Sequence, residues 1–247
     1  MTPMGADAPE LAAALAAALD LPRVLRFAEV ESTMDAAHAV AAAGAPAGTL
    51  VLADAQRAGR GRGGKAWRSA PGAGLWLTLI ERPSDTVALG VLSLRVGLRL
   101  APVLERWAEG AVRLKWPNDL FIGAGKLAGV LVETRWRGAR PDWVAIGIGI
   151  NLRRPDVDVA SAALRDADPT TVLAEVIPAV RAAAWAEGPL TDRERAEFAS
   201  RDLALGQRIA QPAHGLVRGV APSGELLVET AEGLTPVRSG SLIFATP

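Results

Sequence analysis

The chain has 247 residues, half of them apolar, and its 27 basic and 27 acidic residues give a formal net charge of zero. This balance argues against the global positive field of nucleic-acid-binding proteins, and the length allows one large domain or a medium domain plus a small one. The absence of cysteine excludes disulfides and thiolate sites, and the presence of only two histidines argues against a multi-histidine metal site or a Ser-His-Asp triad.

Apolar segments near the N-terminus predict neither a membrane span nor a signal peptide. The alanine- and leucine-rich segment 11–21 is too short to cross a bilayer and lacks a cationic start. We therefore expect a cytoplasmic protein that does not bind membranes.

The first third of the chain predicts alternating helices and strands. Ser32 or Thr33 is placed to cap a helix that ends at Gly44, and the apolar run 50–53 is typical of a buried strand. Helices are expected over 8–20, 34–43 and 87–109, and strands over 24–31, 49–55 and 74–81.

A loop rich in glycine and cations, residues 56–69, connects two of these strands. It contains four glycines interleaved with arginine and lysine and closed by Trp67. Glycine resists backbone order and clustered cations repel one another, so this mixture favours an anion-binding loop over a packed element. Because strands hold both of its ends, the loop is expected to close over a ligand.

The remainder predicts a meander, two helices and a small barrel. The Trp-Pro-Asn-Asp sequence at 116–119 indicates a turn, and alternating glycines in 142–151 allow either tight packing or close approach of a ligand. Strands are expected over 112–115, 120–122, 126–136 and 142–151, helices over 169–186 and 191–203, and about five short strands from 205 to 244.

Clustered cations are the strongest chemical signal. Arg60, Arg62, Lys65 and Lys126 are candidate anion-binding groups, and no general base stands out. Such a set fits phosphoryl or nucleotidyl transfer, in which positioning and charge neutralisation dominate. The sequence contains neither a P-loop nor a convincing dinucleotide fingerprint. Only three lysines occur in an arginine-rich chain, which favours a functional role for at least one of them.

Four motifs together resemble the signatures of biotin protein ligases. These are the loop A-G-R-G-R-G-G-K-A-W-R-S at 58–69, K-W-P-N-D-L at 115–120 followed by K-L-A-G-V-L-V-E at 126–133, E-S-T-M at 31–34, and G-I-G-I-N at 147–151. Their order and spacing agree with that family. The resemblance implies an α+β fold in which helices flank a mixed sheet, similar to class II tRNA synthetase cores, followed by an SH3-like barrel. It places a catalytic domain at 1–202 and the barrel at 203–247.

The implied reaction is ATP-dependent and AMP-forming, with biotin, ATP and Mg²⁺ as its small molecules. Biotin is activated to biotinyl-5′-AMP and then transferred to a lysine of the biotin carboxyl carrier domain of acetyl-CoA carboxylase and related carboxylases. The resemblance assigns catalysis to Lys126, Arg60 and Arg62. It assigns biotin binding to Ser32, Thr33, Met34, Gln56, Arg60, Gly61, Arg62, Lys126 and Gly129, and nucleotide binding to Arg62, Trp67, Asn118, Lys126 and Asn151. No metal ligand is assigned, although Asp119 is a candidate.

This sequence departs from the family pattern at several positions. Met34 replaces a usual asparagine, and Gly63 and Lys65 stand where arginines are common. Ser241 replaces a frequent glutamate, so an ion pair between loop and barrel is expected to be missing. No DNA-binding domain is expected, hence no repressor function and no nucleic-acid partner.

Two alternative functions remain at this stage, and the oligomeric state is open. Lipoate or octanoate transfer is a related activity, but the absent cysteine and the arginine-glycine loop favour biotin. An RNA-contacting R-G-R-G-G segment is disfavoured by the balanced charge and by the lack of interleaved aromatics. Trp116 is expected to be a core residue. A monomer and a homodimer are both compatible with the sequence.

Overall fold

The computed structural model describes residues 8–157 and 159–245, so the first seven residues of the expected catalytic domain lie outside it. The helices and strands fall close to the predicted ranges. Their bounds are α1 (Ala8–Ala18), β1 (Arg23–Val30), α2 (Thr33–Ala42), β2 (Thr49–Gln56), η1 (Arg62–Gly64), β3 (Gly74–Glu81), α3 (Thr86–Leu104), η2 (Glu105–Trp107), β4 (Val112–Lys115), β5 (Asp119–Ile122), β6 (Gly125–Arg137), β7 (Arg140–Asn151), α4 (Pro169–Ala184), α5 (Asp192–Arg201), β8 (Arg208–Gln211), β9 (Gly215–Val220), β10 (Leu226–Thr230), β11 (Gly233–Val237) and β12 (Ile243–Phe244).

Side-chain caps set where the helices begin. The Ser32 hydroxyl accepts a hydrogen bond from the Met34 amide at the start of α2, as the sequence predicts. Asp85 and Asp168 cap α3 and α4 in the same way, and Thr191 caps α5 in a reciprocal capping box. These caps satisfy amide groups that a helix cannot pair internally.

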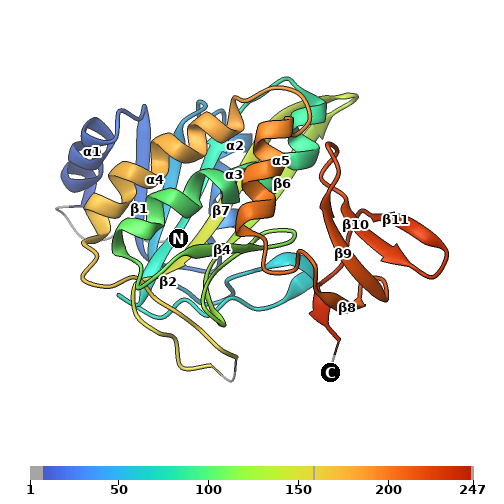
Figure 1. The fold of residues 1–247 in the computed structure, drawn as a ribbon. Coiled ribbons are helices and arrows are strands. Elements are labelled where there is room, and N and C mark those ends of the chain that lie inside the picture. The colour runs from blue at the N-terminus through green and yellow to red at the C-terminus, as the bar shows by residue number, and fades with distance from the viewer. Residues whose placement is uncertain (1–7, 158, 246–247) are drawn as a thin grey trace.

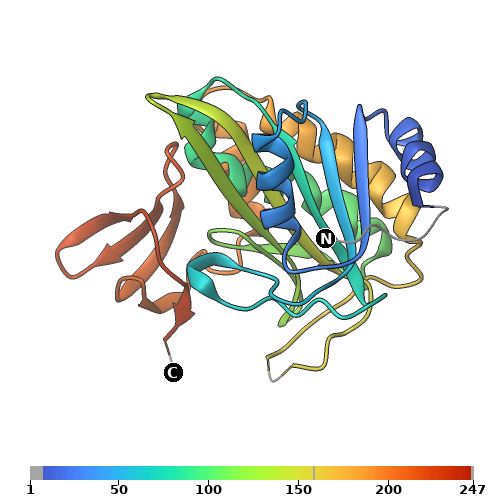
Figure 2. The same cartoon turned by 180° about the vertical axis from the view of Figure 1, so that it is seen from behind.

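The strands form two sheets. The larger has seven strands in the order β1-β2-β3-β7-β6-β5-β4, with β1 parallel to β2 and the other neighbours antiparallel. The smaller is antiparallel, in the order β11-β10-β9-β8-β12, and lies to one side of the larger sheet in Figures 1 and 2. This is the expected mixed α+β fold, and the five C-terminal strands are consistent with an SH3-like domain.

The two faces of the large sheet are covered unequally. Helices α3 and α4 pack on one face (Figure 1), where alternate β7 residues such as Val144, Ile146 and Ile148 enter the main core. The other face carries α2, which contacts β2, β3 and β7 (Figure 2). On that face β7 presents Gly147 and Gly149, because side chains alternate along a strand. Loop 56–69 lies on the same face, against β6 and β7.

Helix α3 is apolar for a reason that lies in the fold. Residues 86–107 are long and hydrophobic enough to cross a membrane by length and composition alone, yet 61% of the most apolar window is buried inside the protein. The helix packs between the large sheet, α4 and α5. Its composition is therefore explained by its position in the core.

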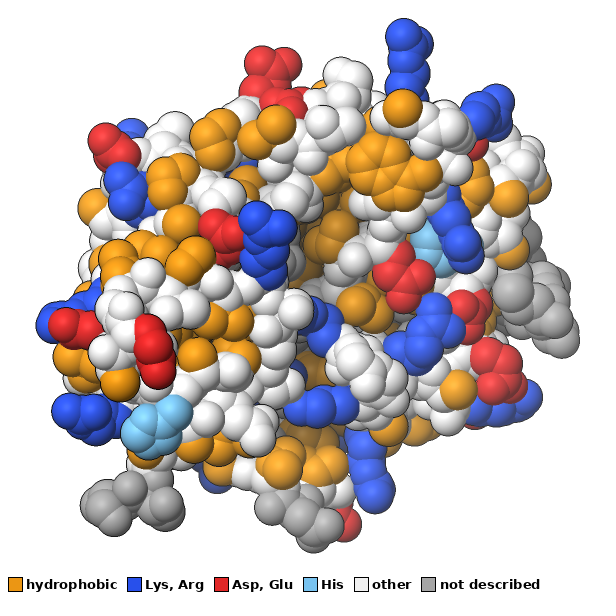
Figure 3. All heavy atoms as spheres, turned by 90° about the vertical axis from the view of Figure 1, so that its right-hand side faces the viewer, with side chains coloured by type: hydrophobic (Ala, Val, Ile, Leu, Met, Phe, Trp, Pro, Cys, Tyr) orange, Lys and Arg blue, Asp and Glu red, His pale blue; other side chains and the backbone are white. Residues whose placement is uncertain are grey.

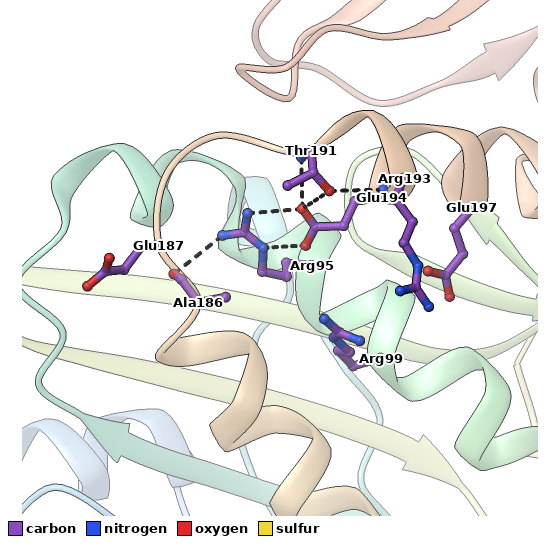
Figure 4. A pocket seen from close by; sticks show the side chains of 8 residues that line it. All are labelled: Arg95, Arg99, Ala186, Glu187, Thr191, Arg193, Glu194 and Glu197. Carbon is purple, nitrogen blue, oxygen red and sulfur yellow. Dashed lines mark hydrogen bonds and ion pairs between the residues drawn. The ribbon is translucent and has the colours of Figure 1, made fainter.

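A buried ion pair joins α3 to α5. The Arg95 guanidinium, 1% exposed, donates to Glu194 from Nε (2.7 Å) and Nη2 (3.2 Å), and it also reaches carbonyls of the connection before α5 (Figure 4). Burial opposes the charge on Glu194, but hydrogen bonds from Arg95 and Thr191 more than offset it and lower its pKa to about 2. The pair therefore stays charged and fixes the angle between the helices.

The C-terminal sheet is fastened to the large one through buried contacts. Trp116 is 2% exposed, as expected for a core residue, and its indole donates to the Gly224 carbonyl (3.0 Å). The Arg113 guanidinium donates to the carbonyls of Arg201 and Asp202. We propose a domain boundary between 202 and 203, in the connection between α5 and β8.

Asp202 in this connection should make stability depend on pH. Its side chain is buried, and burial raises its pKa to about 6 although the Ala204 amide donates to it. A raised folded-state pKa gives stability at low pH that is lost as pH rises through 6. From pH 4.5 to 7.5 the wild type should lose about 2 kcal/mol relative to Asp202→Asn, measured by urea unfolding. A pH-independent difference would contradict this.

Candidate active site

Buried polar side chains form a corner at the start of α2. The Gln56 carboxamide oxygen accepts from the amide (2.8 Å) and hydroxyl (3.1 Å) of Thr33, and its nitrogen donates to the Ser69 hydroxyl (2.7 Å). Thr78 in turn donates to the Thr33 hydroxyl (3.0 Å), and both Ser32 and Thr33 are almost fully buried. Fixed donors and acceptors in an apolar setting are typical of a site for a small ring with amide-like groups.

Met34 fills the space beside this corner. It is 3% exposed, and a Cβ on Gly147 would lie 2.7 Å from its terminal methyl. The flexible thioether therefore packs on the bare backbone of β7. The Met34 side chain contributes apolar packing and no hydrogen bond, which follows from the departure from the asparagine of the family pattern.

Loop 56–69 is an ordered hairpin. Bridges pair Gln56 with Ser69 and Arg60 with Ala66, and the Gly61 amide donates to the Lys65 carbonyl (2.7 Å). The tip turns at 63–64, where both glycines have positive φ of 65° and 74°. Glycine is favoured in this region because it lacks a Cβ.

The Trp67 indole lies on a floor of glycines in the large sheet. A Cβ on Gly149 would lie 2.5 Å from the ring, and one on Gly129 would lie 3.1 Å from it. Trp76 meets the ring edge-on, 6.4 Å between centroids, and the Lys126 Nζ lies 4.9 Å from the ring centre. Of the two interpretations of the alternating glycines, close packing of a side chain is the one this structure displays at Gly147 and Gly149.

Three cations, Lys126, Arg62 and Lys115, lie near the Asp119 carboxylate, and Lys65 lies near Lys115. Lys126 Nζ is 2.7 Å from Asp119 Oδ1. Burial lowers the pKa of Arg62, and the Asp119 charge opposes that effect. Burial also lowers the pKa of Lys115, with Lys126 and Lys65 adding repulsion. All three lysines of the chain therefore contribute to one positive cluster, and Figure 3 shows Lys and Arg side chains along a hollow in this side of the molecule. The excess positive charge favours an anionic guest.

Arg60 is the exception among the predicted cations. Its Nη1 lies 2.6 and 2.7 Å from the two oxygens of Asp35, and its Nη2 lies 3.6 Å from Glu133 Oε1. In this structure two carboxylates hold the Arg60 guanidinium, and its assignment to a substrate anion beside Arg62 and Lys126 stays a prediction. Gly61 stands between the two arginines in the hairpin.

The C-terminal sheet reaches the positive cluster. Lys65 Nζ donates to the Ser241 hydroxyl at 3.1 Å. At Ser241, where an ion pair was expected to be missing, the structure has a hydrogen bond between the loop and the C-terminal sheet. Lys115 Nζ lies 5.6 Å from the ring centres of both Phe121 and Phe244, so one cation bridges the two sheets.

The side-chain amides of Asn118 and Asn151 donate hydrogen bonds to backbone carbonyls of the protein. Asn118 Nδ2 donates to the Val130 carbonyl (2.7 Å), and Asn151 Nδ2 donates to those of Lys126 and Ala162 (3.1 Å each). The three bonds hold backbone segments of the site in place. Their assignment to the nucleotide stays a prediction, and in this structure they shape the walls of the site.

Comparison with known proteins decides the family. The model of the biotin/lipoate A/B protein ligase family matches residues 27–151, which spans β1 to β7 and every element of the site except its C-terminal wall. The chain belongs to the biotin/lipoate A/B protein ligase family.

Relatives and solved structures extend the match beyond that region. A biotin--[acetyl-CoA-carboxylase] ligase of Paracoccus denitrificans is 31% identical over 218 residues, covering 78% of this chain and 89% of the relative. The bifunctional ligase/repressor BirA of Bacillus subtilis is 39% identical over 130 residues, which is 52% of this chain but 40% of that relative. Biotin protein ligase from Aquifex aeolicus in complex with biotin and ATP has a TM-score of 0.74 at 26% identity, covering 92% of this chain and 100% of that one.

In this member of the ligase family, the described residues contain no cluster of three or more His, Asp or Glu side chains that could hold a metal ion. Mg²⁺ commonly binds through one or two protein carboxylates together with substrate phosphates and water. Asp119, beside the positive cluster, fits a shared site of that kind.

Sequence reasoning did not find several residues of this ligase-family site, namely Asp35, His38, Ser69, Thr78 and Glu133. The sequence contained a signal for two of these residues. Asp35 and His38 are three residues apart in a predicted helix, so they share a face. Glu133 closes one of the family motifs, but only the packing of α2 on the sheet shows that these three side chains meet.

Proposed function

We propose that this chain is a biotin–protein ligase that forms biotinyl-5′-AMP from biotin and ATP and passes biotin to a lysine of a biotin carboxyl carrier domain. The positive cluster of Arg62, Lys65, Lys115 and Lys126, to which hairpin 56–69 contributes two members, carries the proposal. It is supported by the likeness of the chain to a ligase solved with biotin and ATP. The carrier partner follows from relatives named for acetyl-CoA carboxylase. Cytoplasmic location is part of the same proposal.

In the first step a biotin carboxylate oxygen attacks the α-phosphorus of ATP, and the bond to the bridging oxygen breaks to release pyrophosphate. Lys126 lies where it would neutralise the reacting oxygens, and Arg62 approaches the same point from the hairpin. Lys126 is held by Asp119 before reaction, so little reorganisation of that charge is required. Asp119 would hold Mg²⁺, which supplies charge neutralisation on the phosphates.

In the second step the amine of a carrier lysine attacks the acyl carbon. The carbon–oxygen bond to phosphate breaks, AMP leaves, and the amine loses a proton. Lys126 remains beside the acyl phosphate through both steps. The hairpin, with Trp67 packed on the sheet, excludes water from the mixed anhydride between them.

In this proposal, each part of the site binds a particular group of biotin or ATP. The corner of Ser32, Thr33 and Gln56 takes the ureido ring of biotin, with Met34 packing against its apolar part. Gly61 and Gly129 allow close approach of backbone. Trp67 takes the adenine face, and the walls held by Asn118 and Asn151 border the nucleotide.

Pyrophosphate exchange tests the proposal directly. Labelled pyrophosphate should enter ATP when biotin and Mg²⁺ are added, because adenylation is reversible while the adenylate stays bound. Lipoate and octanoate, the alternative acids, serve as matched controls and should support exchange at least tenfold more slowly, since a polar corner discriminates against acids that leave it unpaired. Exchange with lipoate alone would replace this function by lipoate activation, and no exchange with any acid would overturn both.

A further inference from the structure

Two carboxylates outside loop 56–69 hold the guanidinium of Arg60. One lies on α2 and the other on β6. Asp35 lies in the first turn of α2 and binds Arg60 through both oxygens, at 2.6 and 2.7 Å. Glu133 lies on β6, with Oε1 3.6 Å from Arg60 Nη2. One cation between two carboxylates leaves no excess positive charge to offer a substrate anion. The Asp35 hydrogen bond is also the main reason that the pKa of Arg60 is raised.

Glu133 is itself held by a buried side-chain relay. Its other oxygen, Oε2, is 2.9 Å from Nε2 of His38, and Nδ1 of His38 is 2.9 Å from the indole nitrogen of Trp143. Indole nitrogen only donates, so Nδ1 must accept and Nε2 must carry the proton donated to Glu133. His38 is 9% exposed, whereas Glu133 is about one-third exposed. The buried ring therefore orients the more exposed carboxylate toward Arg60.

The backbone at Arg60 connects this anchor to the hairpin. Arg60 bridges Ala66 across the hairpin, and the next residue, Gly61, donates to the Lys65 carbonyl. Arg62 follows immediately and lies near Asp119. A shift of Arg60 along α2 would therefore move Gly61 and Arg62 with it.

We propose that Arg60 is a positioning residue that anchors hairpin 56–69 to α2 and β6 through Asp35 and Glu133, with His38 and Trp143 fixing the Glu133 carboxylate. Arg62 is then the hairpin arginine that meets the substrate anion. This inference deepens the proposed function and rests on it for the substrate, but the anchoring itself is a property of the free protein.

Whether biotin affinity falls or rises distinguishes an anchoring role of Arg60 from direct contact between Arg60 and biotin. Asp35→Asn and Glu133→Gln each remove one carboxylate from Arg60. If Arg60 anchors the hairpin, each variant should weaken biotin binding about three- to tenfold in calorimetry without ATP, the range expected for a partly exposed charged hydrogen bond. If Arg60 instead binds the biotin carboxylate, removing a competing carboxylate should strengthen binding, and that result would overturn the proposal.

Amide hydrogen exchange in the free protein tests whether the contacts of Arg60 order the hairpin, with no substrate present. The amides of Gly61 and Trp67 are bonded across the hairpin, to the carbonyls of Lys65 and Gly59. Both should exchange faster in Asp35→Asn and Glu133→Gln. Glu29→Gln is the matched control, because Glu29 pairs with Arg57, whose amide bonds to Val30 on β1 and not across the hairpin, and it should leave their exchange unchanged. Unchanged exchange in both anchor variants would overturn the proposal. Absence of biotin binding by the wild type would reject the proposed function instead.

Two substitutions of His38 test the relay. Glutamine places its amide near the position of Nε2 and keeps the donor to Glu133, whereas asparagine places its carbonyl near Nδ1 and keeps only the acceptor for Trp143. The relay predicts near-normal hairpin exchange and biotin affinity in His38→Gln, and the loosened behaviour of Glu133→Gln in His38→Asn. Equal effects of both variants would indicate that His38 acts by packing alone and would remove it from the proposal.

Discussion

Lys126→Ala is expected to lower the rate of biotin-dependent pyrophosphate exchange by about 10²–10³-fold, the usual cost of removing one preorganised charge at a reacting oxygen. The side chain is fixed in advance by Asp119 Oδ1 at 2.7 Å and by the Trp67 ring, with 4.9 Å from Nζ to the ring centre. The loss should appear in the maximal rate, because the charge matters most where negative charge develops in the transition state.

Lys65→Ala is the matched control for this experiment. Lys65 belongs to the same positive cluster, but it is exposed at the hairpin tip and bonded to Ser241. It should change the exchange rate less than about threefold, since an exposed charge interacts weakly through water. Comparable loss in both variants would mean that the total field matters and not the position of Lys126. Normal exchange in Lys126→Ala would contradict its assignment.

Local pattern predicted most of the fold and the framework of the site. The strand 74–81 has the bounds expected from its apolar run, and the cap at Ser32 was read from residue type alone. These features depend on neighbours within a few positions, and sequence displays such neighbours directly. Residue type alone marked the loop cations and Lys126 as candidate anion-binding groups, but only the family resemblance placed them in one site, because the two segments are far apart in the chain.

Contacts between distant elements explain what the sequence did not predict. Arg60 was assigned to a substrate anion through the family resemblance, and the sequence displays no partner for a cation in a glycine loop. Its partners, Asp35 and Glu133, are 25 and 73 residues away and meet it only after α2 packs on the sheet. The amides of Asn118 and Asn151 are taken up by carbonyls in the same way. Polar residues that are conspicuous in the sequence thus shape the walls of the site in this structure, and their contact with a ligand stays a prediction.

Gly149→Ala is expected to shorten the lifetime of the bound adenylate by about 30–150-fold, because it displaces Trp67 from the surface of the sheet. An added Cβ would lie 2.5 Å from the indole, and β7 cannot yield because β3 and β6 pair with it on both sides at this residue. Displacing a large apolar side chain costs about 2–3 kcal/mol, which gives that range. Gel filtration of the enzyme with labelled adenylate, followed by timed release, measures the lifetime.

A series of glycine-to-alanine variants tests whether the shorter adenylate lifetime comes from displacement of the Trp67 indole and not from a general disturbance of the sheet. Gly129→Ala should act more weakly, since its Cβ would lie 3.1 Å from the ring edge, and Gly90→Ala on α3 should act not at all, because nothing lies within 4 Å of the added atom. In the double variant Gly149→Ala/Trp67→Ala the clash is gone, so stability toward urea should recover while adenylate lifetime stays short. Recovery of both would show that the hairpin retains the adenylate without Trp67, and that the glycine floor serves packing of the lid alone.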